Sequence, residues 1–242
     1  LSSFTPVKVL KGIFKQSKGA GYFRRVLVVF QFAISIGLII STVIVFQQIS
    51  HARNRSLGYD PNNLIMLWMS DDLSKNYDVV KQELLNTGNI EAVTKASSPM
   101  TGIWNSWSDF SWEGKDPHSD LVLDVIMTEY DYEKATGIKI KQGRAFSRDF
   151  ADSNSAILNE AALKMIGYKD PVGKTMKLGD QTLNIIGINE DVLMANPFKP
   201  VAPAIILFNK DRGAVILLRL KNNADLQKSL AAMKPIMERH NP

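Results

Sequence analysis

Residues 26–49 read VLVVFQFAISIGLIISTVIVFQQI, a run of about 24 residues without a charged side chain. As an α-helix this run would extend about 36 Å, because each residue adds about 1.5 Å. The hydrocarbon core of a bilayer is about 30 Å thick. A buried core helix of a globular protein rarely stays apolar on every face over this length. The run therefore predicts one transmembrane helix over residues 26–49.

Basic residues precede this run and set its expected orientation. Six lie before it, whereas only Arg53 and Arg55 follow closely, and Asp60 is the first acidic residue of the chain. The positive-inside rule predicts a cytoplasmic basic linker over residues 1–25 and an extracytoplasmic domain over residues 50–242. The six are Lys8, Lys11, Lys15, Lys18, Arg24 and Arg25.

The run does not resemble a cleavable signal peptide. Its apolar stretch is longer than the roughly 7–15 residues of a signal sequence, and no small-residue cleavage site follows it. Because the chain begins with Leu1 rather than methionine, we expect it to be a piece of a longer protein.

Composition excludes several classes of protein. Hydrophobic residues make up 45% of the 242, so a disordered chain is excluded, and the absence of cysteine excludes disulfides and thiolate zinc sites. The formal net charge of +5 comes from the basic segment, because the rest of the chain carries 23 basic and 24 acidic residues. A nucleic-acid-binding fold spreads its cations over a face or groove. We therefore expect no nucleic-acid partner.

Small residues recur at every fourth position of the predicted transmembrane helix. Ala33, Gly37 and Ser41 would share one helical face. Small residues at this spacing let a second helix approach closely in lipid. The pattern predicts a helix-packing face, although Gly and Ser are also ordinary components of membrane spans.

Residues 58–242 predict an α+β domain with two lobes. Its expected helices are residues 77–85, 130–136, 160–166 and a final one capped by Asp225 and running to about Glu238. Gly137 and Gly167 would end the second and third helices. Short apolar or alternating runs predict the strands: 64–69, 92–96, 110–112, 121–127, 138–141, 156–159, 175–178, 182–188, 204–208 and 215–220.

Catalytic and metal-binding patterns are missing from the sequence. His51, His118 and His240 have neither a second histidine nor a carboxylate at a ligand-like spacing, and no Gly-x-Ser-x-Gly motif occurs. The adjacent acids Asp71 and Asp72 are typical of a solvated surface. We expect no enzyme activity, no metal and no cofactor.

One motif imitates a phosphate-binding loop. The stretch from Gly167 to Thr175 ends in Gly-Lys-Thr, but five residues rather than four separate Gly167 from Gly173, and Pro171 lacks an N–H. A phosphate loop leads into a helix, whereas residues 175–178 predict a strand. Nucleotide binding is therefore not expected.

Three of the four tryptophans lie close together. Trp104, Trp107 and Trp112 fall within a stretch rich in Ser, Asp and Gly. They predict either an exposed aromatic patch for a partner or an apolar substrate, or packing within hairpins and the core.

The order of these segments resembles the MacB/FtsX-like family of ABC transporter permeases, specifically a long subclass with two copies of the permease module. The resemblance covers essentially the whole chain, and each piece is weak when taken alone. Its pieces are residues 1–12, 25–36, 57–60 (Leu-Gly-Tyr-Asp), 137–147, 156–161, 170–175 (Asp-Pro-Val-Gly-Lys-Thr), 185–188 and 217–220 (Leu-Leu-Arg-Leu).

The resemblance implies a mechanical transmitter in the bacterial inner membrane. A cytosolic ABC ATPase would move the membrane helices, and these would move a MacB-like periplasmic core domain outside. The parts that the resemblance assigns to transmission are the basic segment Pro6–Lys18, the face of Ala33, Gly37 and Ser41, and the exit segment Gln47–Arg55. Other helices of the same permease in a dimeric assembly are implied partners, as is an envelope partner.

A different reading is a membrane-anchored sensor or ligand-binding module. The single span, the tryptophan-rich loop and the lack of catalytic motifs also suit such a protein. Helices and a second permease motif beyond Pro242 would favour the permease, whereas a signalling domain would favour the sensor.

Overall fold

The computed structural model describes residues 18–116, 118–119, 121–194 and 196–241. The chain divides after Arg55 into two compact units, residues 1–55 and 56–242. Residues 1–17, which hold most of the predicted Pro6–Lys18 segment, lie outside the described part.

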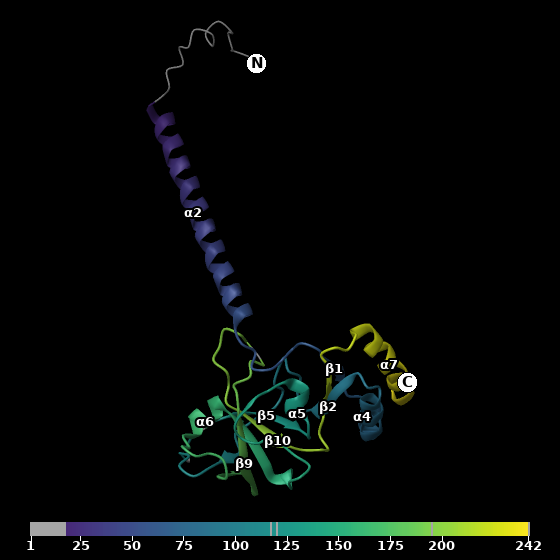
Figure 1. The fold of residues 1–242 in the computed structure, drawn as a ribbon. Helices are drawn as coiled ribbons and strands as arrows, with labels where there is room; N and C mark the ends of the chain where they lie inside the picture. Colours follow the sequence, from purple (N-terminus) through teal and green to yellow (C-terminus); the bar gives the residue numbers. More distant parts are fainter. Residues whose placement is uncertain (1–17, 117, 120, 195, 242) are drawn as a thin grey trace. The chain divides into compact units, whose positions relative to one another are not determined.

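The first unit contains one long helix, α2 (Lys18–Asn54), drawn in purple and blue in Figure 1. It extends beyond residues 26–49 at both ends and would measure about 56 Å at the usual helical rise. Every described side chain from residue 21 to 49 is exposed within this unit. Length and composition are sufficient for α2 to cross a membrane.

The second unit is built on one mixed sheet in which eleven strands are hydrogen-bonded. Nine follow the order β1-β11-β2-β5-β10-β7-β9-β8-β4, while β3 pairs with β5 and β6 pairs with β9. The strands are β1 (Leu64–Trp68), β2 (Ile90–Ala96), β3 (Ser106–Trp107), β4 (Phe110–Ser111), β5 (Leu123–Thr128), β6 (Ile140–Gly143), β7 (Ser155–Asn159), β8 (Thr175–Leu178), β9 (Gln181–Asn189), β10 (Ala204–Phe208) and β11 (Val215–Leu220).

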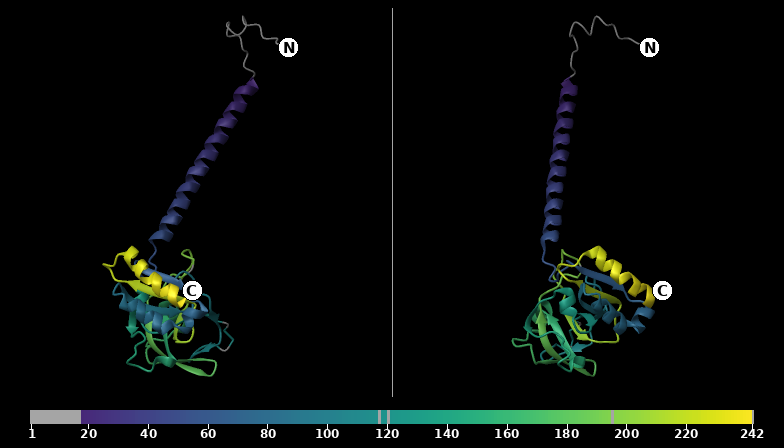
Figure 2. Two further views of the ribbon diagram at one scale, coloured as in Figure 1. Left: turned by 90° about the vertical axis from the view of Figure 1, so that its right-hand side faces the viewer. Right: turned by 45° about the vertical axis from the view of Figure 1, so that its right-hand side comes forward.

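The helices of this unit are short except for α4 and α7, which lie side by side (Figures 1 and 2). They are α3 (Asp71–Lys75), α4 (Tyr77–Asn86), α5 (Tyr132–Thr136), α6 (Glu160–Ile166), α7 (Leu226–His240) and the 3₁₀ turn η1 (Asp152–Asn154). Local chemistry explains several ends. Asp225 caps α7 by accepting a hydrogen bond from the Lys228 N–H, and Gly167 ends α6 in the left-handed conformation.

The second unit has two lobes, as the sequence predicts, and they meet between β2 and β5. β1, β11 and β2 form one lobe with α3, α4 and α7, and the strands from β5 to β4 form the other. The ladders of the two lobes join at one residue pair, Ala96 of β2 with Thr128 of β5. The sheet is therefore least continuous at the boundary between the lobes.

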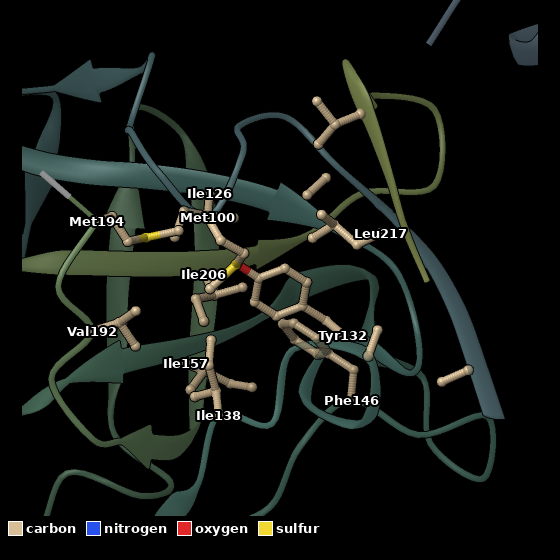
Figure 3. Close-up of a cluster of buried hydrophobic side chains, with 14 residues drawn as sticks. Met100, Ile126, Tyr132, Ile138, Phe146, Ile157, Val192, Met194, Ile206 and Leu217 are labelled. Carbon is tan, nitrogen blue, oxygen red and sulfur yellow. The ribbon is translucent and has the colours of Figure 1, made fainter. Parts of the chain in front are cut away.

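Three hydrophobic clusters hold the unit together. One lies between α4, α7 and one face of β2 and β11, and another packs α6 against β7, β9 and β10. The third lies between the lobes and combines Ala92 and Leu217 of the first lobe with Ile126 and Ile206 of the second and with Tyr132 of α5 (Figure 3). Burial of this shared cluster compensates for the narrow strand pairing.

The α+β class and all the strands and helices expected in residues 58–242 are confirmed, with boundaries that agree within two residues. Three short elements are not predicted by the sequence patterns: α3, β3 and the 3₁₀ turn η1. The helix α3 begins at Asp71 behind the cap Ser70, so the acids Asp71 and Asp72 are exposed in its first turn. The two-residue strand β3 is too short to have a periodicity.

Candidate functional site

The segment that directly follows α2 is held by a buried arginine. Arg219 lies in β11, where every side chain is buried, and only 5% of it is exposed. Its Nε donates to the Ala135 carbonyl at 3.0 Å and its Nη2 to the Asp60 carbonyl at 2.8 Å. Its Nη1 donates to the Asn62 carbonyl and lies 3.2 Å from Asp60 Oδ2. We call Arg219, Asp60, Asn62 and Ala135 the Arg219 clamp.

Glycines allow the backbones in the clamp to approach closely. Gly137 has a φ of +75°, and a Cβ there would lie 2.8 Å from the Asp60 Cβ. This approach lets the Asp60 N–H donate to the Thr136 carbonyl at 2.9 Å. Gly58 has a φ of +74°, and a Cβ there would lie 2.1 Å from the Asp191 carbonyl oxygen. A side chain fits at neither position.

A third contact joins the entering segment to the end of β9. The Leu193 N–H donates to the Leu57 carbonyl at 2.8 Å, beside the close approach of Gly58 to Asp191. Main-chain groups of residues 57–62 are therefore tied to α5, β11 and the segment after β9.

Two other segments of the family resemblance, residues 137–147 and 185–188, contact each other where β6 pairs with β9. A Cβ on Gly143 would lie 2.1 Å from the Ile186 carbonyl, so β6 and β9 pair without room for a side chain. The next residue, Arg144, pairs with Asp152 through both of its terminal nitrogens, at 2.9 and 2.7 Å. Asp152 also accepts from the Ser147 N–H and the Ser155 hydroxyl.

These partners determine the protonation of Asp152. Burial by itself would raise the pKa of this carboxyl. The Arg144 guanidinium and the two neutral donors more than offset it and lower the pKa below its usual range. The carboxylate is therefore ionised at neutral pH and serves as a structural anchor.

A buried polar network links the lobes beside their strand junction. Glu129, which follows β5, accepts from the Tyr77 hydroxyl at 2.5 Å and from Lys81 Nζ at 2.8 Å. Lys81 Nζ also lies 3.8 Å from Asp131 Oδ2. Burial, together with the Glu129 carboxylate, raises the pKa of the Tyr77 phenol. Tyr77 therefore stays protonated and ties α4 to the end of β5.

The three small residues of α2 are arranged as helical spacing requires. Ala33, Gly37 and Ser41 are exposed, and a Cβ on Gly37 would meet no atom within 4 Å. The Ser41 hydroxyl donates to the Gly37 carbonyl at 2.8 Å, so it needs no partner from another helix. Their role as a packing face remains a prediction.

The structure separates the three clustered tryptophans. Trp107 and Trp112 are half-buried and pack against the cluster around α6. Trp104 is half-exposed and stacks on Trp68 of β1, with ring centroids 5.6 Å apart and planes 3° apart. Trp68 is itself 62% exposed, so it belongs to any partner patch that includes Trp104. Trp68 was not predicted to join this group because it lies far from Trp104 in the sequence.

The loop that imitates a phosphate-binding loop, and the histidines, occupy structural positions. Thr175 begins strand β8 rather than a helix, and the Gly173 N–H donates to the Ile185 carbonyl, so this loop is a strand connection as predicted. His240 Nε2 lies 3.1 Å from Glu83 Oε2 at the end of α7. Within the described ranges, no three histidine or carboxylate side chains are grouped to hold a metal ion.

Arg219 belongs to the Leu-Leu-Arg-Leu motif of the family resemblance, but its role in the clamp was not predicted from the sequence. The available signal is a single charge in the otherwise apolar strand Val-Ile-Leu-Leu-Arg-Leu. A buried charge needs partners, but no pattern in the sequence identifies carbonyls 84 and 157 residues away.

Comparison with known proteins agrees with this architecture. The family model described as the MacB-like periplasmic core domain matches residues 26–236. The periplasmic region of MacB from Actinobacillus actinomycetemcomitans aligns at 15% identity over 76% of this chain and 86% of that chain, with a TM-score of 0.53.

The extracellular domain of the noncanonic ABC-type transporter YknZ from Gram-positive bacteria aligns at 14% identity, over 74% of this chain and 95% of that chain, with a TM-score of 0.51. At these identities both likenesses show the fold. No curated protein sequence matches the chain. The match of the family model confirms the resemblance seen in the sequence: the chain belongs to the family of MacB-like periplasmic core domains, the non-catalytic extracytoplasmic domain of ABC transporter permeases of the MacB/FtsX type.

Proposed function

We propose that this chain transmits ATP-driven motion from a cytosolic ATPase, through its membrane helix, to the extracytoplasmic domain. The observation that carries the proposal is the Arg219 clamp. Residues 57–62 follow α2 within a few positions, and the Asp60 and Asn62 carbonyls accept hydrogen bonds from Arg219 of the buried strand β11. A flexible tether would suffice for a domain that was only anchored.

The membrane part of the proposal follows from the sequence. The N-terminus is cytoplasmic in the bacterial inner membrane, and the domain from about residue 50 is extracytoplasmic. Ala33, Gly37 and Ser41 pack against another helix of the permease in a dimeric assembly. The exit segment Gln47–Arg55, whose residues up to Asn54 are helical, delivers the motion to residue 56.

The ATPase partner is tested by affinity purification of the intact parent protein from detergent-solubilised membranes, with retained proteins identified by mass spectrometry. We expect a stoichiometric ABC ATPase. Retention of a kinase or an envelope protein without any ATPase would overturn the permease reading and support the sensor.

Transmission is tested in the purified complex with its ATPase by distance measurements between spin labels. The chain has no cysteine, so Asp180→Cys introduces the only one, in the β8–β9 turn, and each of the two copies in the proposed dimeric assembly then carries one label. We expect the distance distribution between the labels to shift when the ATPase is trapped in its ATP-bound state.

A matched pair of insertions separates transmission from general disturbance. Gly-Gly-Ser inserted between Arg55 and Ser56 should abolish the shift while ATPase binding persists. The same insertion between Gly173 and Lys174, an exposed loop, should preserve it. An unchanged distribution on ATP binding in the bound complex, or an equal response to both insertions, would contradict transmission.

A further inference from the structure

A mostly apolar cavity of about 150 Å³ lies at one edge of the sheet in the second unit. The parallel strands β7 and β9 end there, and β10 begins there. Ile126, Ile138 and Ile206 line one side, and Val192 and Met194 of the β9–β10 connection line the other (Figure 3). These residues belong to the cluster shared by the two lobes.

One side chain among the lining residues has a buried polar atom without a hydrogen-bond partner. Asn189, at the end of β9, lines the cavity and is 2% exposed, and its Oδ1 accepts no hydrogen bond from the described residues. Its Nδ2 donates to the Glu190 carbonyl at 2.6 Å. The amide cannot be turned round, because Oδ1 would then face another carbonyl oxygen.

The neighbouring Asn159 differs from Asn189, because all of its side-chain polar atoms have hydrogen-bond partners. Its Nδ2 donates to the Ala202 carbonyl, and its Oδ1 accepts from the N–H groups of Ala162 and Ala204. Asn159 and Asn189 are register partners on adjacent strands. The side-chain amide of Asn159 has hydrogen-bond partners on both Oδ1 and Nδ2, whereas Asn189 Oδ1 has none. A buried acceptor without a donor is costly, typically by about 1–3 kcal/mol.

Size and charge limit what can fill the cavity. A cavity of about 150 Å³ lined by aliphatic side chains is large enough to bind benzene. The charged residues that line it, Asp124 and Lys199, are of opposite sign and leave no net charge. The contents should therefore be uncharged, apolar and of about six to eight non-hydrogen atoms, with one donor for Asn189 Oδ1.

We infer that this cavity is a binding site for a small uncharged apolar molecule, or the apolar end of a larger one, that carries a single hydroxyl or N–H group. The donor pairs with Asn189 Oδ1, and the apolar body replaces the missing contacts between Val192 and the three isoleucines. The inference goes beyond the transmitter role and does not depend on it, because binding requires no ATPase.

The test uses the full chain in detergent micelles with labelled Ile, Val and Met methyl groups, and phenol and toluene as probes. Phenol should shift the methyl resonances of Ile126, Ile206 and Met194 saturably and show contacts to them. It should bind about 3- to 10-fold more tightly than toluene, which has the same size but no donor, once partition into micelles is subtracted.

Variants separate the hydrogen bond from the space. Asn189→Leu should remove the preference for phenol over toluene, and Val192→Phe, which fills the cavity, should weaken both probes more than 10-fold. Val172→Phe, at an exposed position in the loop before β8, is the matched control and should change neither.

Absence of saturable shifts at these methyl groups with either probe would overturn the inference. So would equal affinities for phenol and toluene, or equal effects of Val192→Phe and Val172→Phe. If Asn189→Leu does not fold, the Val192→Phe comparison and the probe ratio in the unaltered chain still decide the matter.

Discussion

Arg219 is the residue on which most contacts of the entering segment depend. Replacing it with methionine keeps an apolar side chain but removes the donors to three carbonyls. The unfolding free energy of the domain should therefore fall by about 3–5 kcal/mol. Arg219→Lys should recover less than half of this loss, since one ammonium cannot reach all three carbonyls.

The measurement is urea unfolding of the full chain. Arg212→Met is the control, because Arg212 is exposed in the loop before β11, and it should change stability by less than about 0.5 kcal/mol. Similar losses in Arg219→Met and Arg212→Met would mean that the clamp contributes nothing to the fold.

Asp152 gives the domain a defined acid sensitivity. Its pKa is lowered in the folded state relative to the unfolded chain, so its contribution is fully present above an unfolded pKa of about 3.9. The contribution is lost as the pH falls through the lower folded pKa. Unfolding free energy should therefore decrease below about pH 4.

Asp152→Asn tests this assignment. The variant should lose about 2–3 kcal/mol at pH 7, where the unaltered chain holds the paired carboxylate, and its stability should depend less steeply on pH below 4. Asp180→Asn, at an exposed turn, should leave both quantities unchanged. The same acid slope in Asp152→Asn and the unaltered chain would contradict the role of this carboxylate.

At the scale of an element, α2 presents one face of small residues. A leucine at Gly37 fits the isolated helix, because its Cβ would meet no neighbouring atom, so Gly37→Leu acts only on a second helix that approaches this face. We expect the variant to lose association with the other permease helices and the proposed transmission, while the thermal transition of the domain stays unchanged.

Ser35→Leu is the control for this variant. Ser35 lies two residues away, about 160° round the helix from Gly37, so a bulky side chain there faces another direction. Detergent-resistant association is measured by chemical cross-linking of the parent permease. Retained association and transmission in Gly37→Leu would remove this face from the transmission pathway.

At the scale of the whole molecule, residues 56–242 hold all three hydrophobic clusters, the clamp and the network at the lobe junction. We expect a chain beginning at Ser56 to fold without α2 and to unfold in one cooperative transition, because the shared cluster couples the lobes. Far-ultraviolet circular dichroism and tryptophan fluorescence should give coincident curves.

A chain beginning at Asn63 is the informative comparison. It lacks the Asp60 and Asn62 carbonyls that Arg219 binds, so Tm should fall by about 6–12 °C. Two separate transitions in the longer chain would show that the lobes fold independently. Equal Tm values would show that residues 56–62 are not part of the folded unit.

Most helices and strands of this protein, and their order along the chain, could be predicted from local patterns in the sequence. The uncharged run of residues 26–49 predicts α2, and Gly137, Gly167 and Asp225 mark helix ends through backbone conformation and capping. These features can be predicted from the sequence because each depends on residues within a few positions of one another. The family motifs can be recognised for the same reason, because they are short local patterns in a fixed order.

The contacts between these elements could not be predicted in this way and are seen only in the folded domain. It brings Leu57–Asn62 to Arg219, separates Trp104 from Trp107 and stacks it on Trp68, and leaves Asn189 unpaired where Asn159 is satisfied. Periodicity tells which face of a strand is buried but not which strand lies beside it. Contacts between residues tens to more than a hundred positions apart arise from packing of the whole sheet, and the clamp and the cavity consist of such contacts.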